Sequence, residues 1–414
     1  MAKLFVILFT ALLLFSNISS GQNAIPSGTA RYEALGYNPF ITDASIDLNR
    51  NPSWGSTYRN YIFGDIGRNT VNGYQLTDQF AAVNFGVSKE ITLGVVLNKR
   101  EDLYNNFIGD PTYDSARINQ PIVPFKVLFD WSNGNISLGF APYYTSWSDD
   151  YRFAPTNDTT ALQTKKSSYS FGATAGILAM VDKLSWIEGS VDFKMNMFSK
   201  EDIGTLNQTI DNDGGMQFTI GTRGFFVVDK KSNFSIVPYL GFGMYSWNPT
   251  NSMDTSLLPQ YSQWKFDGGI GINTKVLDHG MFAGGLSFGY QSVETEQVNL
   301  SAANTNTTTY FILPKFNLGL EWNFTDWIQG RMGYSRSVTS RDDEWKTQNL
   351  TQEYSQTVAS DPDQTITLGL GFQFGRFSLD GTIGEKFFKE GFYVISGKSN
   401  EMFGILSASY NFNK

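Results

Sequence analysis

The connections between predicted β-strands alternate strictly between short and long, and this alternation limits the possible folds more than any other feature. Short turns are predicted at residues 89–90, 132–135, 182–184, 229–233, 277–280, 323–326 and 375–376. Longer connections, rich in Asp, Asn, Thr and Ser, are predicted at 100–120, 148–167, 199–214, 248–261, 299–308, 338–363 and 385–400. Bacterial outer-membrane barrels place short turns on the periplasmic side and long loops outside. A soluble sandwich has no reason to sort its loops by length, so the pattern favours a membrane barrel.

Residues 216–247 show the repeating unit of the chain. Phe218 and Ile220 lie on one face of an extended segment, whereas Thr219 and Arg223 lie on the other, which is the period of a strand. The alternation resumes after the polar turn at 229–233 and so predicts an antiparallel hairpin. The turns given above define seven such hairpins, and a first and a last strand near 56–66 and 401–412 bring the total to about sixteen. We therefore predict an all-β fold, a transmembrane antiparallel up-and-down β-barrel of fourteen to sixteen strands.

Composition agrees with a barrel. Aromatic residues make up 15% of the chain and Gly occurs 40 times, yet the mean hydropathy is only −0.24. A membrane protein with so low a value must place its apolar residues in alternate positions, as a barrel does. The absence of Cys excludes disulfides and thiolate metal sites. The net charge of −8, with no long basic cluster, argues against binding of nucleic acid.

Tryptophans lie near the predicted strand ends. Trp131, Trp186 and Trp327 are beside short turns, and Trp147 and Trp247 are where strands enter long connections. Rings at both ends of the strands are typical of the aromatic girdles at the two membrane interfaces. We therefore predict an aromatic girdle at each rim of the barrel.

The first 21 residues have the pattern of a secretory signal peptide. Lys3 precedes an apolar run over 4–15, and small residues follow at Ser19, Ser20 and Gly21. A membrane anchor is the alternative, but the run is roughly a dozen residues long, against the ~20 that a spanning helix needs. No later segment is continuously apolar over such a length. The expected location is therefore the outer membrane of a Gram-negative bacterium, after export.

Residues 22–53 do not alternate and contain Pro26, Gly28, Pro39 and Pro52. These breakers exclude a strand or a long helix, so we predict an irregular segment ahead of a barrel that comprises residues 54–414.

Four short motifs follow one another in this segment: Thr29-Ala30-Arg31, Ala34-Leu35-Gly36, Asp43-Ala44-Ser45 and Asn51-Pro52. The series resembles the opening of the FadL-like long-chain fatty acid transporter family, outer-membrane barrels of fourteen strands whose amino terminus folds inward as a hatch. Thr42 replaces the first Asp of the family's Asp-Asp-Ala-Ser, and Ser53-Trp54 replaces its Ala-Gly. The resemblance implies that residues 22–53 form a hatch or plug and that the cargo is hydrophobic. The residues that would contribute to the hatch are Asp43, Ser45, Asn51 and Pro52; they could equally be simple turn caps, and a hatch is itself a set of turns.

Charged residues occur on the polar side of the predicted strands, interleaved with Gly and Ser. The predicted lumen-facing residues are Lys126, Asp130, Glu188, Asp192, Lys194, Arg223, Lys315 and Glu321. Charges of both signs on the inward face are tolerated in a hydrated lumen. They would either pair across strands and hold the barrel together, or form a row of selective binding groups.

An enzyme is not expected. The only histidine, His279, is in a predicted periplasmic turn, away from the rim where an outer-membrane hydrolase would need it. Asp211-Asn212-Asp213-Gly214 begins like a calcium loop but lacks the acidic residue at the twelfth position. We therefore predict no catalytic site, metal site or cofactor.

The predicted function is a channel or transporter for passive uptake of small hydrophobic molecules, in contact with outer-membrane lipid. The alternatives are a hydrophilic general porin, which the lumen charges favour, and a structural or docking barrel of a surface or secretion complex. Whether the protein forms a homo-oligomer or binds a surface-complex partner stays open.

Overall fold

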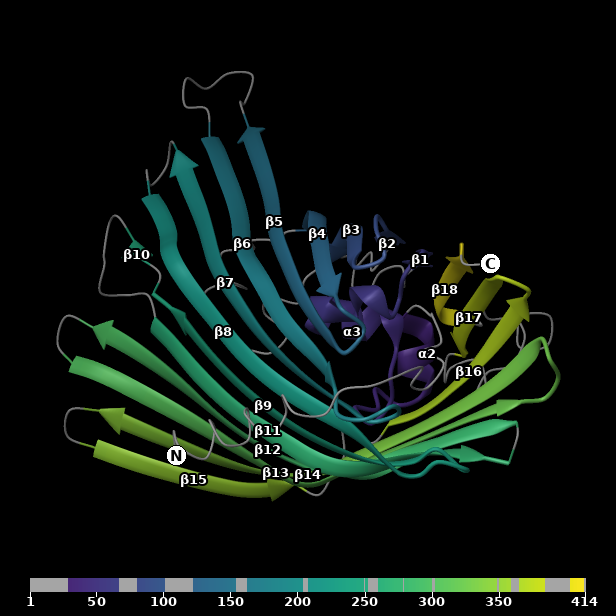
Figure 1. Ribbon diagram of the computed structural model, residues 1–414. Helices are drawn as coiled ribbons and strands as arrows, with labels where there is room; N and C mark the ends of the chain where they lie inside the picture. The colour runs from purple at the N-terminus through teal and green to yellow at the C-terminus, as the bar shows by residue number, and fades with distance from the viewer. Residues whose placement is uncertain are drawn as a thin grey trace, which may run out of the picture.

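The protein is a closed antiparallel β-barrel (Figure 1). The computed structural model describes residues 29–66, 80–100, 122–153, 162–203, 208–248, 250–251, 260–277, 279–299, 302–347, 350–358, 365–383 and 403–412. Strand β1 pairs with both β2 and β18, and this double pairing closes the sheet. The predicted signal peptide, residues 1–21, lies outside the described residues.

The strands follow one another around the wall in chain order. They are β1 (Tyr61–Ile66), β2 (Phe80–Gly86), β3 (Ile91–Arg100), β4 (Ile122–Ser132), β5 (Ile136–Phe153), β6 (Leu162–Met180), β7 (Trp186–Ile203), β8 (Gln208–Asp229), β9 (Phe234–Trp247), β10 (Thr250–Asn251), β11 (Gln260–Val276), β12 (Gly280–Asn299), β13 (Ala302–Asn323), β14 (Ile328–Thr347), β15 (Leu350–Val358), β16 (Thr365–Phe374), β17 (Phe377–Ile383) and β18 (Phe403–Asn411). The short β10 pairs with the beginning of β8, and β15 and β16 pair with successive parts of β14. Of the 18 strands in the described residues, β10 and β15 are therefore extensions, and 16 form the wall.

The predicted fold class is confirmed, and each of the seven predicted short turns joins two neighbouring strands. Sixteen wall strands agree with the hairpin count and exceed the fourteen that the family resemblance implies. Four predicted long connections are wrong, because residues 148–167, 199–214, 299–308 and 338–363 lie mostly within strands. Their polar composition suits strands that extend beyond the lipid, where both faces meet water. For the same reason, the calcium-loop-like residues 211–214 lie inside β8.

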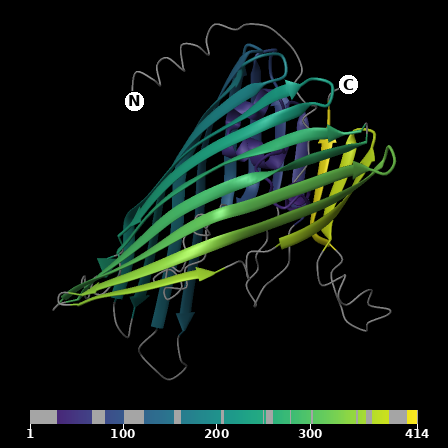
Figure 2. The ribbon, with the colours of Figure 1, turned by 90° about the horizontal axis from the view of Figure 1, so that it is seen from below.

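The barrel wall is uneven in height. The strands from β5 to β14 are mostly 17 to 22 residues long, whereas β1, β2 and β17 have only 6 or 7. Figure 2 shows the long strands slanting beyond the short ones, with the helices enclosed by the wall. In the described ranges, no helix has the length and apolar character needed to cross a bilayer.

The two faces of the wall are inverted relative to those of a soluble protein. On β4, the rings of Phe125 and Phe129 are 47% and 41% exposed, whereas Lys126 and Asp130 are 3% and 1% exposed. Apolar side chains thus cover the outside and charged ones point inward. This arrangement is favourable only when the outside is lipid.

A substitution pair on β7 tests this assignment. Phe193 points outward and is 39% exposed, so Phe193→Arg should cost on the order of 2 to 4 kcal/mol in lipid. Asp192→Asn, on the inward side of the same strand, should cost far less. Equilibrium unfolding of the two variants in lipid vesicles measures both costs, and equal values would contradict the assignment of faces.

The predicted girdles are only partly observed. Trp131 and Trp327 face outward beside short turns, with exposures of 38% and 47%. Trp186 and Trp247 instead face the interior and are 5% and 1% exposed, so their assignment to a girdle is wrong. The register of each strand decides the face, and proximity to a turn does not. The side chain of Trp147 lies outside the described part of the structure.

The amino-terminal segment is helical where irregular structure was predicted. It contains α2 (Thr29–Ala34), α3 (Ala44–Arg50) and the 3₁₀-helix η1 (Pro52–Ser56). Its Gly and Pro residues separate these short helices rather than preventing them. The first strand begins at Tyr61, so the predicted boundary at residue 54 is too early. We call residues 29–60 the plug, because its helices lie inside the wall and contact it on opposite sides (Figure 1).

Candidate functional site

The interior wall is built to receive the plug at close range. Phe40 lies on Gly271 and Gly285, which pair with each other across β11 and β12. A Cβ atom on these glycines would approach the Phe40 ring to 2.5 and 2.6 Å. Gly369 receives Ala34 in the same way, with 2.5 Å between the two Cβ positions. Any larger residue at these positions would force the plug away from the wall.

Apolar side chains of the plug form a packed layer against the wall. Leu35, Phe40, Ile41, Leu48 and Trp54 are each at most 3% exposed. Their partners on the wall belong to the same buried cluster and include Leu178, Trp186, Phe225, Val237 and Ala283. The plug is therefore packed like the core of a soluble domain, although it lies inside a barrel.

Two of the predicted hatch residues begin α3. Asp43 is its N-cap, and its Oδ1 accepts hydrogen bonds from the backbone N–H of Ser45 at 3.2 Å and from the Ser45 hydroxyl at 2.8 Å. The backbone N–H of Asp43 donates in turn to Asp47 at 2.8 Å. All three residues are buried, so these side chains satisfy helix N–H groups that water cannot reach.

The other two predicted hatch residues begin η1. Asn51 caps it by accepting from the backbone N–H of Ser53 at 3.1 Å, and Pro52 occupies the first turn, where no N–H is needed. The Asn51 amide also donates to Ile177 O and to Glu188, both at 3.2 Å. Asn51 is therefore a turn cap and a wall contact at once. Pro52 lies nine residues before β1 and acts within the plug.

Arg223 of β8 is the centre of one buried charge cluster. Its Nε donates to Glu188 of β7 and its NH2 to Asp47 of α3, both at 2.7 Å. Its NH1 donates to Ile41 O at 2.6 Å and to Pro39 O at 3.2 Å. The side chain is 3% exposed, and its guanidinium therefore links two plug segments to the wall in one fixed geometry.

Further plug groups complete this cluster. Glu188 also accepts from Arg50 and from the indole N–H of Trp54. The hydroxyl of Tyr58 donates to Asp47 at 2.8 Å. Burial, and next the carboxylate of Asp47, raise the pKa of Tyr58 well above its usual value, so the hydroxyl stays a donor. Two guanidinium groups thus face two carboxylates, and the cluster is neutral.

A second cluster joins α2 to the opposite part of the wall. Arg31 donates to Glu321 of β13 at 2.8 Å and to Thr42 O at 2.8 Å. Arg331 of β14 donates to the same Glu321 at 2.6 Å and to Asp380 of β17 at 2.5 Å. Burial alone would lower the pKa of Arg31, but the neighbouring Glu321 and Asp43 carboxylates outweigh it and raise the pKa. Glu321 is therefore shared by two buried arginines, one from the plug and one from the wall.

The predicted lumen-facing residues fall into three groups. Glu188, Arg223 and Glu321 form the clusters that hold the plug. A second group lies beyond α3, where Lys126 donates to Asn49 O at 3.2 Å and Lys194 lies 3.7 Å from Asp192. The last two residues belong to neither of these groups. Asp130 is buried against η1, whereas Lys315 lies on the inward side of β13 and is exposed.

Sequence reasoning missed several members of the two clusters. Arg31 belonged to a motif of the resemblance but was given no role, and Asp47, Arg50 and Arg331 were not singled out. A signal was present for Arg331, because it shares the polar side of its strand with Gln329. No local signal marks Asp47, whose importance depends on Arg223, 176 residues away.

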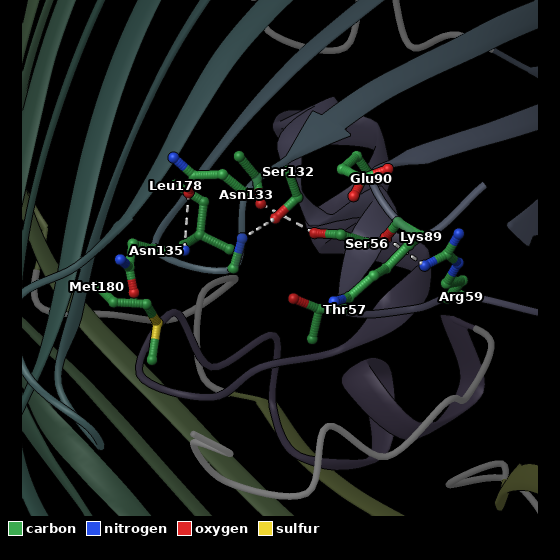
Figure 3. A pocket seen from close by; sticks show the side chains of 12 residues that line it. Ser56, Thr57, Arg59, Lys89, Glu90, Ser132, Asn133, Asn135, Leu178 and Met180 are labelled. Carbon is green, nitrogen blue, oxygen red and sulfur yellow. Dashed lines mark hydrogen bonds between the residues drawn. The ribbon is translucent and has the colours of Figure 1, made fainter. Parts of the chain in front are cut away.

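A cavity opens beside the plug, at the end of the barrel where the short turns lie (Figure 3). Its volume is about 470 Å³. It lies among the β2–β3 turn, the β4–β5 turn and the end of η1, and Figure 3 shows side chains of Ser56, Asn135 and Met180 at its wall. Among the described residues that line it, Leu178 and Met180 are the only apolar ones, and the others carry hydroxyl, amide or charged groups or are glycine.

Comparisons with known proteins give only distant structural matches for this chain. No family model matches it, and no curated protein is similar to it. The ferric yersiniabactin uptake receptor FyuA from Yersinia pestis shares 10% identity over 86% of this chain and 80% of its own, with a TM-score of 0.36. The alcaligin outer-membrane receptor FauA from Bordetella pertussis shares 8% over 85% and 75%, with a TM-score of 0.30. The FrpB iron transporter from Neisseria meningitidis shares 7% over 90% and 84%, with a TM-score of 0.24. TM-scores this low add nothing about cargo.

Proposed function

We propose that the protein is a plugged outer-membrane channel that admits small molecules passively. One observation carries this proposal: a helical plug fills a sixteen-strand barrel and is held there by buried ion pairs to the wall on two sides. A barrel of this size leaves an aqueous channel when nothing fills it. The plug therefore closes a pore, and passage requires that part of it move.

The geometry next to the plug favours polar cargo. The cavity on the periplasmic side is lined mainly by hydroxyl, amide and charged groups, and the plug itself leaves its apolar side chains packed and buried. A site for apolar molecules would instead be lined mainly by hydrophobic side chains. We therefore propose small polar solutes as the first class of cargo.

Hydrophobic cargo is the second candidate, and it rests on the FadL-like order of motifs between Thr29 and Pro52. Uptake assays separate the two. Vesicles with lipopolysaccharide in the outer leaflet, with and without the protein, are offered glucose, an aromatic hydrocarbon and dodecanoate. We expect the protein to accelerate entry of glucose most. Faster entry of the apolar compounds alone would favour the FadL-like alternative.

A docking barrel is the third candidate. Such a protein would accelerate none of these compounds and would copurify in mild detergent with an abundant stoichiometric partner. That pair of results would contradict a channel.

A further inference from the structure

Small residues line up along the inner side of strands β5 and β6, and one bend of the plug packs against them. Gly139 of β5 pairs with Gly176 of β6, and the next inward pair is Ala141 with Thr174. We call these four residues the β5–β6 lane. A Cβ atom on Gly139 would collide with the backbone of Pro52 and Ser53, and one on Gly176 with the side-chain oxygen of Asn51. We call residues 51–56 the corner of the plug. Its first part, Asn51–Ser53, occupies a recess that exists only because these two wall residues lack side chains.

The periplasmic cavity begins where the lane ends. The next inward pair along β5 and β6 is Ser137 with Leu178, and both residues line the cavity. The hydroxyl of Ser137 lies 2.9 Å from that of Ser56, the last residue of η1. This contact lies between the lane and the cavity. Residues 51–56 are also held to the wall by hydrogen bonds from Asn51 to Ile177 O and Glu188, from Trp54 to Glu188 and from the Ser56 N–H to Asp130.

A buried carboxylate flanks the lane. Asp130 of β4 pairs with Gly139 and is 1% exposed. Its Oδ2 accepts the backbone N–H of Ser56 at 2.5 Å, but its Oδ1 has no hydrogen-bond partner among the described residues. A buried carboxylate oxygen without a donor is costly. It is an acceptor placed next to the lane, and a solute with hydroxyl or amide donors would satisfy it.

The other end of the lane meets the lumen beyond α3. There Lys126 reaches Thr174 at 3.4 Å and the backbone oxygen of Asn49 at 3.2 Å. Thr174 in turn donates to Asp192 at 2.7 Å. The lane therefore connects a polar, charged part of the lumen with a polar cavity on the periplasmic side.

The opposite side of the plug is fixed differently. There α2 is held by Arg31 on Glu321, by the backbone N–H of Ala30 on Ser407 at 3.0 Å, and by Ala34 O on Thr367 at 3.1 Å. Separating α2 from this wall would leave the buried charges of Arg31 and Glu321 without each other. Moving residues 51–56 instead breaks hydrogen bonds that neutral groups of Asn51, Trp54 and Ser56 donate to the wall, and it leaves the ion pair of Arg223 with Glu188 in place.

We propose that the β5–β6 lane is the passage through this barrel, that it opens when the corner 51–56 moves off the wall, and that the cavity is its periplasmic exit. The solute it fits is small, polar and rich in hydrogen-bond donors, with Asp130 as its first acceptor at the exit. The proposal rests on the proposed channel function and adds the route and the moving part.

Engineered disulfides test the route, because the chain has no Cys of its own. S56C/S137C would tie the corner to the wall, since hydroxyls 2.9 Å apart place the two Cβ atoms within disulfide reach. A30C/S407C would tie α2 to β18 as the matched control. Glucose influx into proteoliposomes is measured for each protein oxidised and then reduced, and mass spectrometry confirms that each bond forms. We expect oxidised S56C/S137C to fall to the level of protein-free vesicles and to recover on reduction, while A30C/S407C is unaffected.

Other results overturn the proposal in distinguishable ways. Undiminished influx through oxidised S56C/S137C, or equal block by both disulfides, would overturn the lane as the route and leave the channel intact. Absence of glucose influx in the unmodified protein would overturn both the route and the polar channel. A second measurement avoids any change at the plug: N135C carrying a bulky maleimide should lower influx by filling the cavity, whereas labelled K231C on the β8–β9 turn should not. Equal influx through the two labelled proteins would exclude the cavity as the exit.

Discussion

Deletion of residues 22–48 is expected to raise the ion conductance of the protein in planar bilayers by about tenfold or more, because a barrel of sixteen strands leaves an aqueous channel once its interior is empty. The deletion removes α2 and most of α3, and with them Arg31 and Asp47. The wall keeps its strand-to-strand hydrogen bonds, which do not involve the plug. Water can then enter and solvate Glu321 and Arg223, so the wall charges are not left in a dry core.

The intact protein is the reference for this measurement and should conduct poorly. Migration of unboiled and boiled samples in SDS gels shows whether the shortened barrel still folds. High conductance of the intact protein would mean that the plug does not close the pore. A low conductance that survives the deletion would mean that the loops outside the lipid close it instead.

Glu321→Ala is expected to lower the free energy of unfolding by about 3 to 5 kcal/mol, the range for removing one partner of a buried ion pair. The side chains of Arg31 and Arg331 are each 2% exposed and share this carboxylate. Arg331 would keep Asp380, and Arg31 would keep only Asp43 at 3.4 Å and the carbonyl oxygen of Thr42. The variant should also conduct better than the intact protein, since α2 loses its main attachment to the wall.

Glu201→Ala is the matched control. Glu201 pairs with Lys165 at 3.2 Å, and both side chains are more than 40% exposed. Exposed pairs contribute about 0 to 1 kcal/mol, so this variant should unfold nearly like the original protein. Denaturant unfolding in vesicles compares the two, and equal losses of stability would contradict the role assigned to Glu321.

The clusters explain why the predicted lumen charges divide as they do. Both alternatives considered from the sequence involve these residues. Glu188, Arg223 and Glu321 pair and hold the plug, Lys126 donates to the plug residue Asn49, and Lys194 lies beside Asp192 in the lumen. The sequence predicted ion pairs between neighbouring strands, whereas several of these wall charges pair with residues of the plug. The wall charges bind the plug as well as each other, so they stabilise a closed state of the barrel.

The strands and turns of the barrel wall could be predicted from short stretches of sequence. A strand in a barrel alternates lipid-facing and lumen-facing side chains, and short turns need polar residues or Gly, so both can be found within about ten residues of sequence. The seven hairpins, the inward face of Arg223 and the outward face of Phe193 follow from such signals alone. Strand length did not, because polar strands such as β13 that extend beyond the lipid have the composition of loops.

Only the tertiary structure decided how the interior is filled. Arg31 and Glu321 are 290 residues apart, and they meet because the sheet closes and places β13 beside α2. The same closure turns Trp186 inward onto Trp54, with ring centroids 4.7 Å apart, although its neighbourhood in the sequence is that of a girdle residue. Contacts of this kind depend on the register of the whole barrel, and no short stretch of the chain contains that information.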